Sequence, residues 1–243
     1  MQSQLHSHTE CNQKMNIIHQ VLTACARWLK YKSRTEIMKK RILSTLAILS
    51  LIFATNLLTA CDDDDDDDSA PTAGKTVDLG LSVKWADRNV GASSSTDCGY
   101  YYAFGETTTK SEYSVDNSVT YGDEDLNSIS GDATYDAATA NWGSEWRMPT
   151  VTEFKELIDN CEWNWESNGF RVTGSNGNSI FLPAAGGYRG TSLDSYGEEG
   201  MYWSSIPNKL LTKAASVLYI DSDTCYTGLL YRNYGLSVRP VSD

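Results

Sequence analysis

The chain has 243 residues and a formal net charge of −12, from 20 Lys and Arg against 32 Asp and Glu. Its three histidines are His6, His8 and His19, so the sequence beyond them excludes Ser-His-Asp catalysis, Cys-His catalysis and histidine-ligated zinc. The acidic balance also argues against nucleic acid and anionic lipid head groups as partners. Carboxylate-pair chemistry and calcium binding need no imidazole and stay open.

Residues 1–37 are predicted to be an over-extended N-terminus, because they are polar and a better start follows at Met38. A short amphipathic helix at residues 17–28 is the alternative interpretation of this segment.

Residues 38–60 carry the pattern of a secretory signal peptide. A basic start at residues 38–41 precedes an apolar run at residues 42–58, and the run ends in Leu58-Thr59-Ala60-Cys61. This ending resembles the lipobox of bacterial lipoproteins, which implies cleavage before Cys61 and attachment of lipid to its sulfur. A transmembrane helix is the alternative, but the run is shorter than the roughly 20 residues of a span and contains several Ser, Thr and Asn.

Residues 61–74 are predicted to form an acidic tether after the lipidated cysteine. Seven consecutive aspartates, at residues 62–68, repel one another and stay extended and solvated. A calcium-binding loop is disfavoured, because such a loop needs turns and spaced oxygen ligands. The run is similar to the acidic stretch that follows the acylated cysteine in lipoproteins of the Bacteroides group, which implies export to the cell surface.

Three further cysteines, Cys98, Cys161 and Cys225, follow Cys61. Secretion places them in an oxidising compartment, where the odd number allows either one disulfide with a free thiol or no disulfide. Their spacing matches no metal-site pattern.

The remaining residues, 75–243, are enough for one domain with a core. Residues 77–85 alternate apolar and polar side chains, which predicts a strand with one buried face. The sequence GLSVK at residues 80–84 is echoed by GLSVR at residues 235–239. We therefore expect the first and last strands to pair and to close the domain.

An aromatic element at residues 100–106 precedes a polar stretch at residues 107–130, which predicts a long ordered loop. Three acidic residues at 123–125 lie in this loop. We interpret them as solvated loop residues rather than as a metal site, because the turn pattern of a calcium loop is missing.

A helix is predicted to begin after Thr150 and to end near Asn160. Thr150 and Glu153 have the spacing of a capping box, and Pro149 stays outside the helix. One face of the helix carries Val151, Phe154, Leu157 and Ile158.

After an alternating segment that contains Trp163 and Trp165, strands are predicted at residues 170–173 and 179–182. Asn176-Gly177 between them indicates a hairpin, because both residues tolerate positive φ. The glycine-rich bend at residues 183–190 lacks the spacing of a phosphate loop, so it predicts no nucleotide site.

Together these segments resemble the Fibrobacter succinogenes major paralogous domain of gut Bacteroides lipoproteins. The resemblance implies an α+β, C-type lectin-like fold, akin to formylglycine-generating enzymes, with paired terminal strands, a twisted antiparallel sheet, one or two helices and long loops. The matching segments are residues 77–86 (VDLGLSVKWA), 146–150 (WRMPT), 180–186 (IFLPAAG), 202–205 (YWSS) and 232–241 (RNYGLSVRPV).

Two functions known for this fold fit the chain poorly. Formylglycine-generating enzymes rely on closely placed cysteines near the C-terminus, where this chain has only Cys225. Calcium-dependent lectins use a Glu-Pro-Asn or Gln-Pro-Asp loop, whereas Ile206-Pro207-Asn208 lacks the acid before proline.

The C-terminal segment supplies candidate contact residues for a ligand. In residues 217–221, Leu218 and Ile220 are expected to fill the core, so that Val217, Tyr219 and Asp221 face outward. Exposed tyrosines and leucines in a turn-like segment then follow, and such residues suit a binding surface. The alternative is that they belong to the core. The candidates are Val217, Tyr219, Asp221, Asp223, Tyr226, Leu229, Leu230, Tyr231 and Tyr234.

The same segment is similar to the variable region of lipoproteins that a diversity-generating retroelement rewrites. Rewriting of template adenines in Asn codons yields Tyr, Asp, Ser, Thr, Leu, Val, Gly and Cys, which are frequent here, although Lys209 and Lys213 need other codons. A near-copy of the segment beside a reverse-transcriptase gene is the observation that tests this interpretation.

We therefore expect an outer-membrane lipoprotein, exposed at the cell surface, that binds an external protein or glycan non-covalently. We expect no cofactor, no metal and no catalysis, and contact with the membrane only through the lipid on Cys61. A structural or adhesive subunit of a surface assembly is the second expectation, and an enzyme related to formylglycine-generating enzymes is the third.

Overall fold

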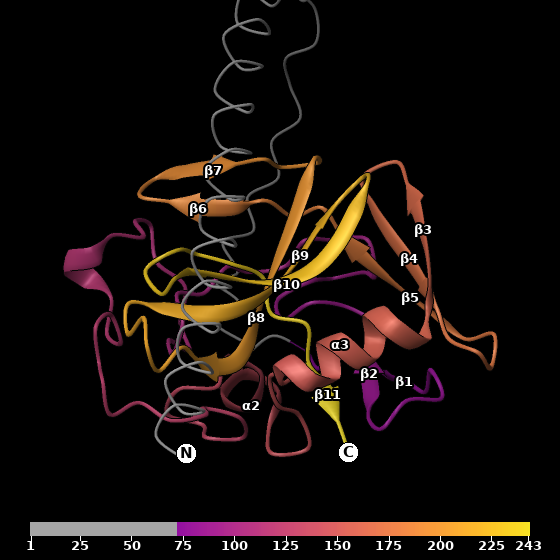
Figure 1. Cartoon of the computed structure of the whole chain (residues 1–243), viewed down its shortest axis with the longest axis horizontal. Helices are drawn as coiled ribbons and strands as arrows, with labels where there is room; N and C mark the ends of the chain where they lie inside the picture. The colour runs from indigo at the N-terminus through magenta and orange to yellow at the C-terminus, as the bar shows by residue number, and fades with distance from the viewer. Residues whose placement is uncertain (1–71) are drawn as a thin grey trace, which may run out of the picture. The chain divides into compact units, whose positions relative to one another are not determined.

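The structure, a computed structural model, describes residues 72–243 (Figure 1). The predictions for residues 1–37, the signal peptide at 38–60, Cys61 and most of the tether at 61–74 therefore lie outside the described residues. Within residues 72–243, no helix has the length and apolar character needed to cross a membrane.

The central sheet is antiparallel and has three strands, β8 (Glu199–Pro207), β9 (Ala214–Asp221) and β10 (Thr224–Tyr231), in the order β10-β9-β8. Both faces of β9 are buried. Ala215 and Val217 pack in one hydrophobic cluster, whereas Leu218 and Ile220 pack in another. The sheet thus separates two halves of the core.

A second antiparallel sheet contains β3 (Glu162–Glu166), β4 (Gly169–Thr173) and β5 (Ser179–Pro183). The predicted hairpin between β4 and β5 is confirmed, with Gly177 at φ 84°. Positive φ is confined to Gly177 in this turn, and Asn176 donates its side-chain amide to the carbonyl of Asp78 at 2.9 Å. This bond ties the hairpin to the N-terminal loop.

The terminal strands pair as expected, in a sheet of order β1-β2-β11. These strands are β1 (Thr76–Val77), β2 (Lys84–Ala86) and β11 (Val241–Ser242), and Val241 lies opposite Trp85.

The bounds of the two predicted terminal strands are wrong. Residues 77–85 are not one strand, since Gly80 adopts φ 76° and its N–H donates to the Asp78 carboxylate at 2.7 Å, which bends the chain. Residues 235–239 form only isolated bridges. Leu236 bridges Tyr102, and its neighbours Gly235 and Ser237 bridge other segments, so no continuous ladder forms.

The predicted helix is α3 (Val151–Asn160), and its capping box is confirmed: the Thr150 side chain accepts from the Glu153 N–H, and the Glu153 carboxylate accepts from the Thr150 N–H. A shorter helix, α2 (Ala137–Trp142), was not expected. Its N-cap is the buried Asp136, whose carboxylate accepts N–H groups of Gly131, Ala138, Thr139 and Met148.

The predicted long loop at residues 107–130 is confirmed and contains one short 3-10 helix, η1 (Val115–Asn117). A small hairpin of β6 (Gly187–Arg189) and β7 (Ser192–Asp194) follows the glycine-rich bend. In Figure 1 this hairpin lies at the end of the domain opposite to the terminal strands.

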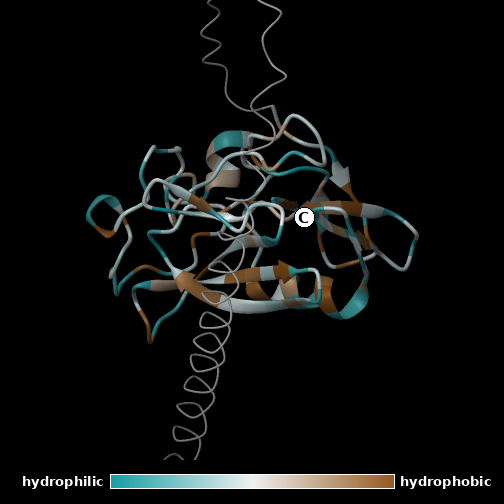
Figure 2. Cartoon of the chain, turned by 90° about the horizontal axis from the view of Figure 1, so that it is seen from above, coloured by the Kyte–Doolittle hydropathy of each residue, from teal (hydrophilic) through white to brown (hydrophobic). Residues whose placement is uncertain are grey.

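The two helices belong to different halves of the core, and α3 packs against the central sheet. Phe154 and Leu157 of α3 belong to the cluster that contains Leu218 and Ile220, whereas the α2 residues Ala137, Ala138 and Trp142 belong to the cluster that contains Val217. Hydrophobic residues are most continuous along the strands, whereas the helices carry both hydrophobic and hydrophilic stretches (Figure 2). The domain is therefore α+β and rich in antiparallel sheet.

The described cysteines Cys98, Cys161 and Cys225 are all free thiols. The structure therefore has no disulfide among these three cysteines, which is one of the two arrangements that the sequence allowed.

Candidate ligand-binding surface

The nine predicted contact residues lie on the β9–β10 hairpin and the chain just after it. The segment that was expected to be turn-like is strand β10, so this prediction is wrong. The reason is its unbroken pairing with β9, from Thr224 opposite Asp221 to Tyr231 opposite Ala214. A regular ladder places successive side chains on opposite faces, so Tyr226 and Leu230 lie on one face of β10, whereas Leu229 and Tyr231 lie on the other.

Val217 does not face outward, and this prediction is also wrong. Its side chain is only 1% exposed and packs in the core with Trp203, its neighbour on β8. The physical reason is that β9 is the central strand and both of its faces are covered. Its side chains alternate between two buried clusters, so neither set points to solvent.

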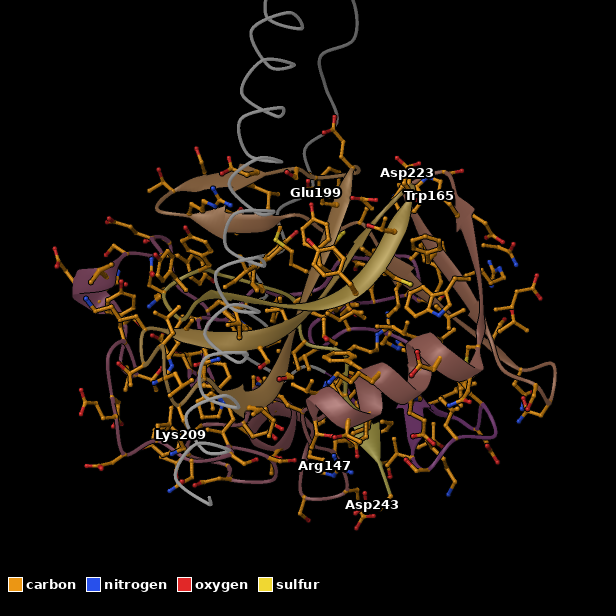
Figure 3. All side chains as sticks on the ribbon, in the orientation of Figure 1. Arg147, Trp165, Glu199, Lys209, Asp223 and Asp243 are labelled. Carbon is orange, nitrogen blue, oxygen red and sulfur yellow. The ribbon has the colours of Figure 1, made fainter. Side chains whose placement is uncertain are left out.

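The Asp221 side chain stabilises the hairpin turn. One of its oxygens accepts hydrogen bonds from the N–H groups of Asp223 and Thr224, both at 2.9 Å. Asp223 itself is exposed at the tip of the hairpin (Figure 3). Asp221 is thus mainly a turn residue, whereas Asp223 can contact other molecules.

The strand register separates the remaining candidates by face. Tyr226 lies opposite Tyr219, and their ring centroids are 5.0 Å apart. Leu230 packs against the same core cluster as Tyr219, whereas Leu229 points to the other face of β10. Tyr226 and Leu229 are 38% and 36% exposed.

A second group of rings gathers where β10 ends. Tyr231 is 47% exposed and contacts the ring of Tyr234 edge to face at 5.9 Å. On its other side Tyr231 lies 6.4 Å from Tyr121 of the long loop, and Lys213 is placed 5.7 Å from the Tyr121 ring centroid.

A small hollow joins the two groups of rings. It lies between the β6–β7 hairpin and β8, and it has room for little more than a water molecule. Arg189 lies over the ring of Tyr234 at 4.8 Å and is 3.9 Å from the Asp194 carboxylate. The lining residues are Gly187, Tyr188, Arg189, Asp194, Ser195, Glu199, Met201, Tyr234 and Leu236.

Tyr219 connects to this hollow through Glu199. Burial raises the pKa of Tyr219 far above its usual value, and a hydrogen bond to the Glu199 carboxylate raises it further. The phenol is protonated at neutral pH, as an ordinary tyrosine is, so in this hydrogen bond it donates to Glu199. Figure 3 shows Glu199 at the start of β8, beside the β6–β7 hairpin.

We call these rings together the tyrosine belt, defined by Tyr121, Tyr219, Tyr226, Tyr231 and Tyr234. It runs around β10 from the face that carries Tyr219 and Tyr226 to the face that carries Tyr231. The residues on it that the sequence did not indicate are Tyr121, Arg189, Asp194 and Glu199, which come from the long loop, the β6–β7 hairpin and β8. The glycine-rich bend at residues 183–190 was the single local signal near them.

Chemically, the tyrosine belt offers aromatic faces, two cations that already lie over rings, and carboxylates at the rim. In the described part of the chain, no group of three or more His, Cys, Asp or Glu is placed to hold a metal ion. Aromatic faces and cations of this kind can make non-covalent contacts with another molecule.

No model of a protein family, no curated protein and no solved structure was found to match the chain.

Proposed function

We propose that this protein binds an external ligand non-covalently through the tyrosine belt. The observation that carries the proposal is the chain of contacts from Tyr226 through Tyr219 and Glu199 to the hollow, and on through Tyr234 to Tyr231. Tyrosine rings supply large contact areas with few rotatable bonds, so they bind at a low cost in conformational entropy. Exposed aromatic rings beside a hollow with room for little more than a water molecule fit a protein or glycan ligand better than a small metabolite.

The proposal includes a place for this surface outside the cell. The signal-peptide pattern, the lipobox before Cys61 and the aspartate run support an outer-membrane lipoprotein that is exposed at the cell surface. The resemblance to the Fibrobacter succinogenes major paralogous domain supports a C-type lectin-like fold, with which the α+β, sheet-rich architecture is compatible.

A binding screen tests the function. The full-length chain is applied to protein and glycan arrays, and the strongest ligand is titrated against wild type and a Tyr226→Ala, Tyr231→Ala double variant. Loss of two exposed rings from the contact surface is expected to weaken binding by about tenfold or more, which corresponds to about 1.4 kcal/mol.

The matched control is Tyr196→Ala, because Tyr196 is 60% exposed and lies outside the tyrosine belt. It is expected to bind as wild type does. Equal binding by wild type and the double variant, with both folded, shows that the ligand contacts another surface.

A structural or adhesive subunit of a surface assembly is the second candidate function. It is favoured by the outer edge of β10, which no strand within residues 72–243 pairs.

A further inference from the structure

Strand β10 has an outer edge without the features that usually prevent edge-to-edge association. Its sequence, TCYTGLLY, contains no charged residue and no proline, and its eight residues pair with β9 without a register shift. Natural sheets protect long edges with charges, prolines, bulges or short strands. An unprotected edge of this length is a template for another strand.

Other outer strands of the described domain carry such protection. Strand β3 begins and ends with glutamates, Glu162 and Glu166. Strand β8 has a register shift between Trp203 and Pro207. Strand β5 is almost wholly buried, and β1, β6, β7 and β11 have only two or three residues. The contrast sets β10 apart.

The hydrogen bonds at the end of the hairpin show which amides face outward. The N–H of Arg232 donates to the Lys213 carbonyl at 2.9 Å, which continues the β9–β10 ladder. Ala214 instead bonds to Leu211 and Asn208, on the side away from β10.

Because bonded and non-bonded pairs alternate in an antiparallel ladder, the residues at even positions from 224 to 230 bond to β9. The N–H and C=O groups of Cys225, Thr227 and Leu229 therefore point away from the sheet.

We propose that a second copy of this chain pairs antiparallel with the outer edge of β10, in a register centred on Thr227. A two-fold axis perpendicular to the sheet maps each face of β10 onto the same face of its copy. Odd-numbered residues therefore lie opposite odd-numbered residues of the partner, and even-numbered residues opposite even-numbered ones. In this register Thr227 meets its own copy and Cys225 meets the partner's Leu229. Cys225, Thr227 and Leu229 are then all paired.

The side chains agree with this register. Thr227 beside the partner's Thr227 is a favourable cross-strand pair. On the other face, Tyr226 lies opposite the partner's Gly228, and each Tyr226 ring stays over Gly228 of its own strand, 3.4 Å from where a Cβ of that glycine would lie.

The charges at the two ends of the hairpin identify a second copy as the occupant. Asp223 is exposed at the tip, and Lys213 is exposed where β9 begins. Figure 3 shows Asp223 and Lys209, which precedes β9, at opposite ends of the domain. An antiparallel copy brings the acidic tip of each chain to the basic end of the other, whereas a parallel copy brings like charges together.

The dimer has a consequence for ligand binding. Since the two-fold axis is perpendicular to the joined sheet, the Tyr219 and Tyr226 rings of both chains lie on the same side of it. A ligand with repeated binding elements then engages two belts at once, which raises its apparent affinity without a new type of contact. The dimer itself does not depend on that function.

Sedimentation velocity of the full-length chain tests the proposal. Wild type is expected to be a dimer, and Thr227→Lys is expected to raise the dimer dissociation constant by about tenfold or more, because two lysines meet on the two-fold axis. Thr227→Val keeps the backbone pairing and a branched side chain, and should remain dimeric. Asn164→Lys places the same charge on the exposed face of another edge strand, β3, and should also remain dimeric.

A covalent test does not depend on loss of association. Hydrogen-bonded residues in an antiparallel pair have Cα atoms about 5.5 Å apart, within the range of a disulfide. Thr227→Cys is therefore expected to form a covalent dimer on mild oxidation, well above the level of wild type and of Asn164→Cys.

A monomeric wild-type chain overturns the proposal, even if it captures an extended peptide at this edge. A Thr227→Lys variant that stays dimeric, or a Thr227→Cys variant that cross-links no more than Asn164→Cys, overturns it as well.

Discussion

At the scale of single residues, buried polar side chains connect distant parts of the chain. Arg239 is fully buried, and its guanidinium donates to the Asn89 side chain and to the carbonyls of Ala86 and Phe181, at 2.8 to 3.0 Å. Burial lowers the pKa of Arg239 to about 10, so it remains charged at neutral pH. In the sequence, Arg239 is recognisable only as the last residue of GLSVR at residues 235–239. Its three hydrogen-bond acceptors come from segments far away along the chain.

Glu153 should make the stability of the domain depend on acidic pH. Burial raises the pKa of its carboxyl group, but hydrogen bonds from the Arg147 guanidinium and the Thr150 N–H outweigh burial, and the net pKa is lowered. A lowered folded-state pKa stabilises the fold above the unfolded value near 4.5, and this stabilisation is lost as pH falls further.

Glu153→Gln is expected to reduce the free energy of unfolding by about 1–2 kcal/mol at pH 7 and by less near pH 3. Urea denaturation at both pH values measures the difference. Glu145→Gln, at an exposed residue before the same helix, should change neither value by more than about 0.5 kcal/mol. An equal loss for Glu153→Gln at both pH values would show that its charge is not involved.

At the scale of elements, local chemistry predicted α3 but not α2. The capping box and the apolar face of α3 lie within eleven consecutive residues, 150–160. Helix α2 has only six residues, and its N-cap Asp136 also accepts from Gly131 and Met148, which belong to loops on either side. Contacts of that kind leave no periodic pattern in the sequence.

The burial of both faces of β9 leads to a test by core truncation. Val217→Ala removes two buried methyl groups and is expected to lower the free energy of unfolding by about 1–3 kcal/mol, because a cavity remains beside Trp203. Ser216→Ala, at the half-buried neighbour on the same strand, should cost less than about 1 kcal/mol. Chemical denaturation measures both. A neutral Val217→Ala would restore the original prediction that this residue faces outward.

At the scale of the whole molecule, the proposed lipid anchor depends on Cys61 alone. In a bacterial host that processes lipoproteins, Cys61→Ser is expected to abolish incorporation of labelled palmitate and to release the chain from the membrane fraction. Cys98→Ser is the control, because Cys98 is a free thiol within the folded domain and should leave labelling intact. Labelling that survives in Cys61→Ser would exclude the lipobox.

Much of the fold could be predicted where short-range chemistry decides it. The α3 capping box, the β4–β5 hairpin and the pairing of terminal strands near Trp85 and Val241 are confirmed. The strand expected at residues 77–85 is interrupted, because an Asp78 to Gly80 turn competes with the alternating pattern. Of the candidate site, the tyrosines of β9 and β10 were indicated, whereas Arg189, Asp194 and Glu199 were not.

The sequence by itself determined the composition-based exclusions, the α3 helix, the hairpin at Asn176-Gly177 and the aromatic character of the C-terminal segment. Only the tertiary structure decided that Val217 is buried, that Asp221 stabilises a turn and that Tyr219 reaches Glu199. The reason is that side-chain alternation gives two faces to every strand, and only the packing of other elements decides whether one or both faces are buried.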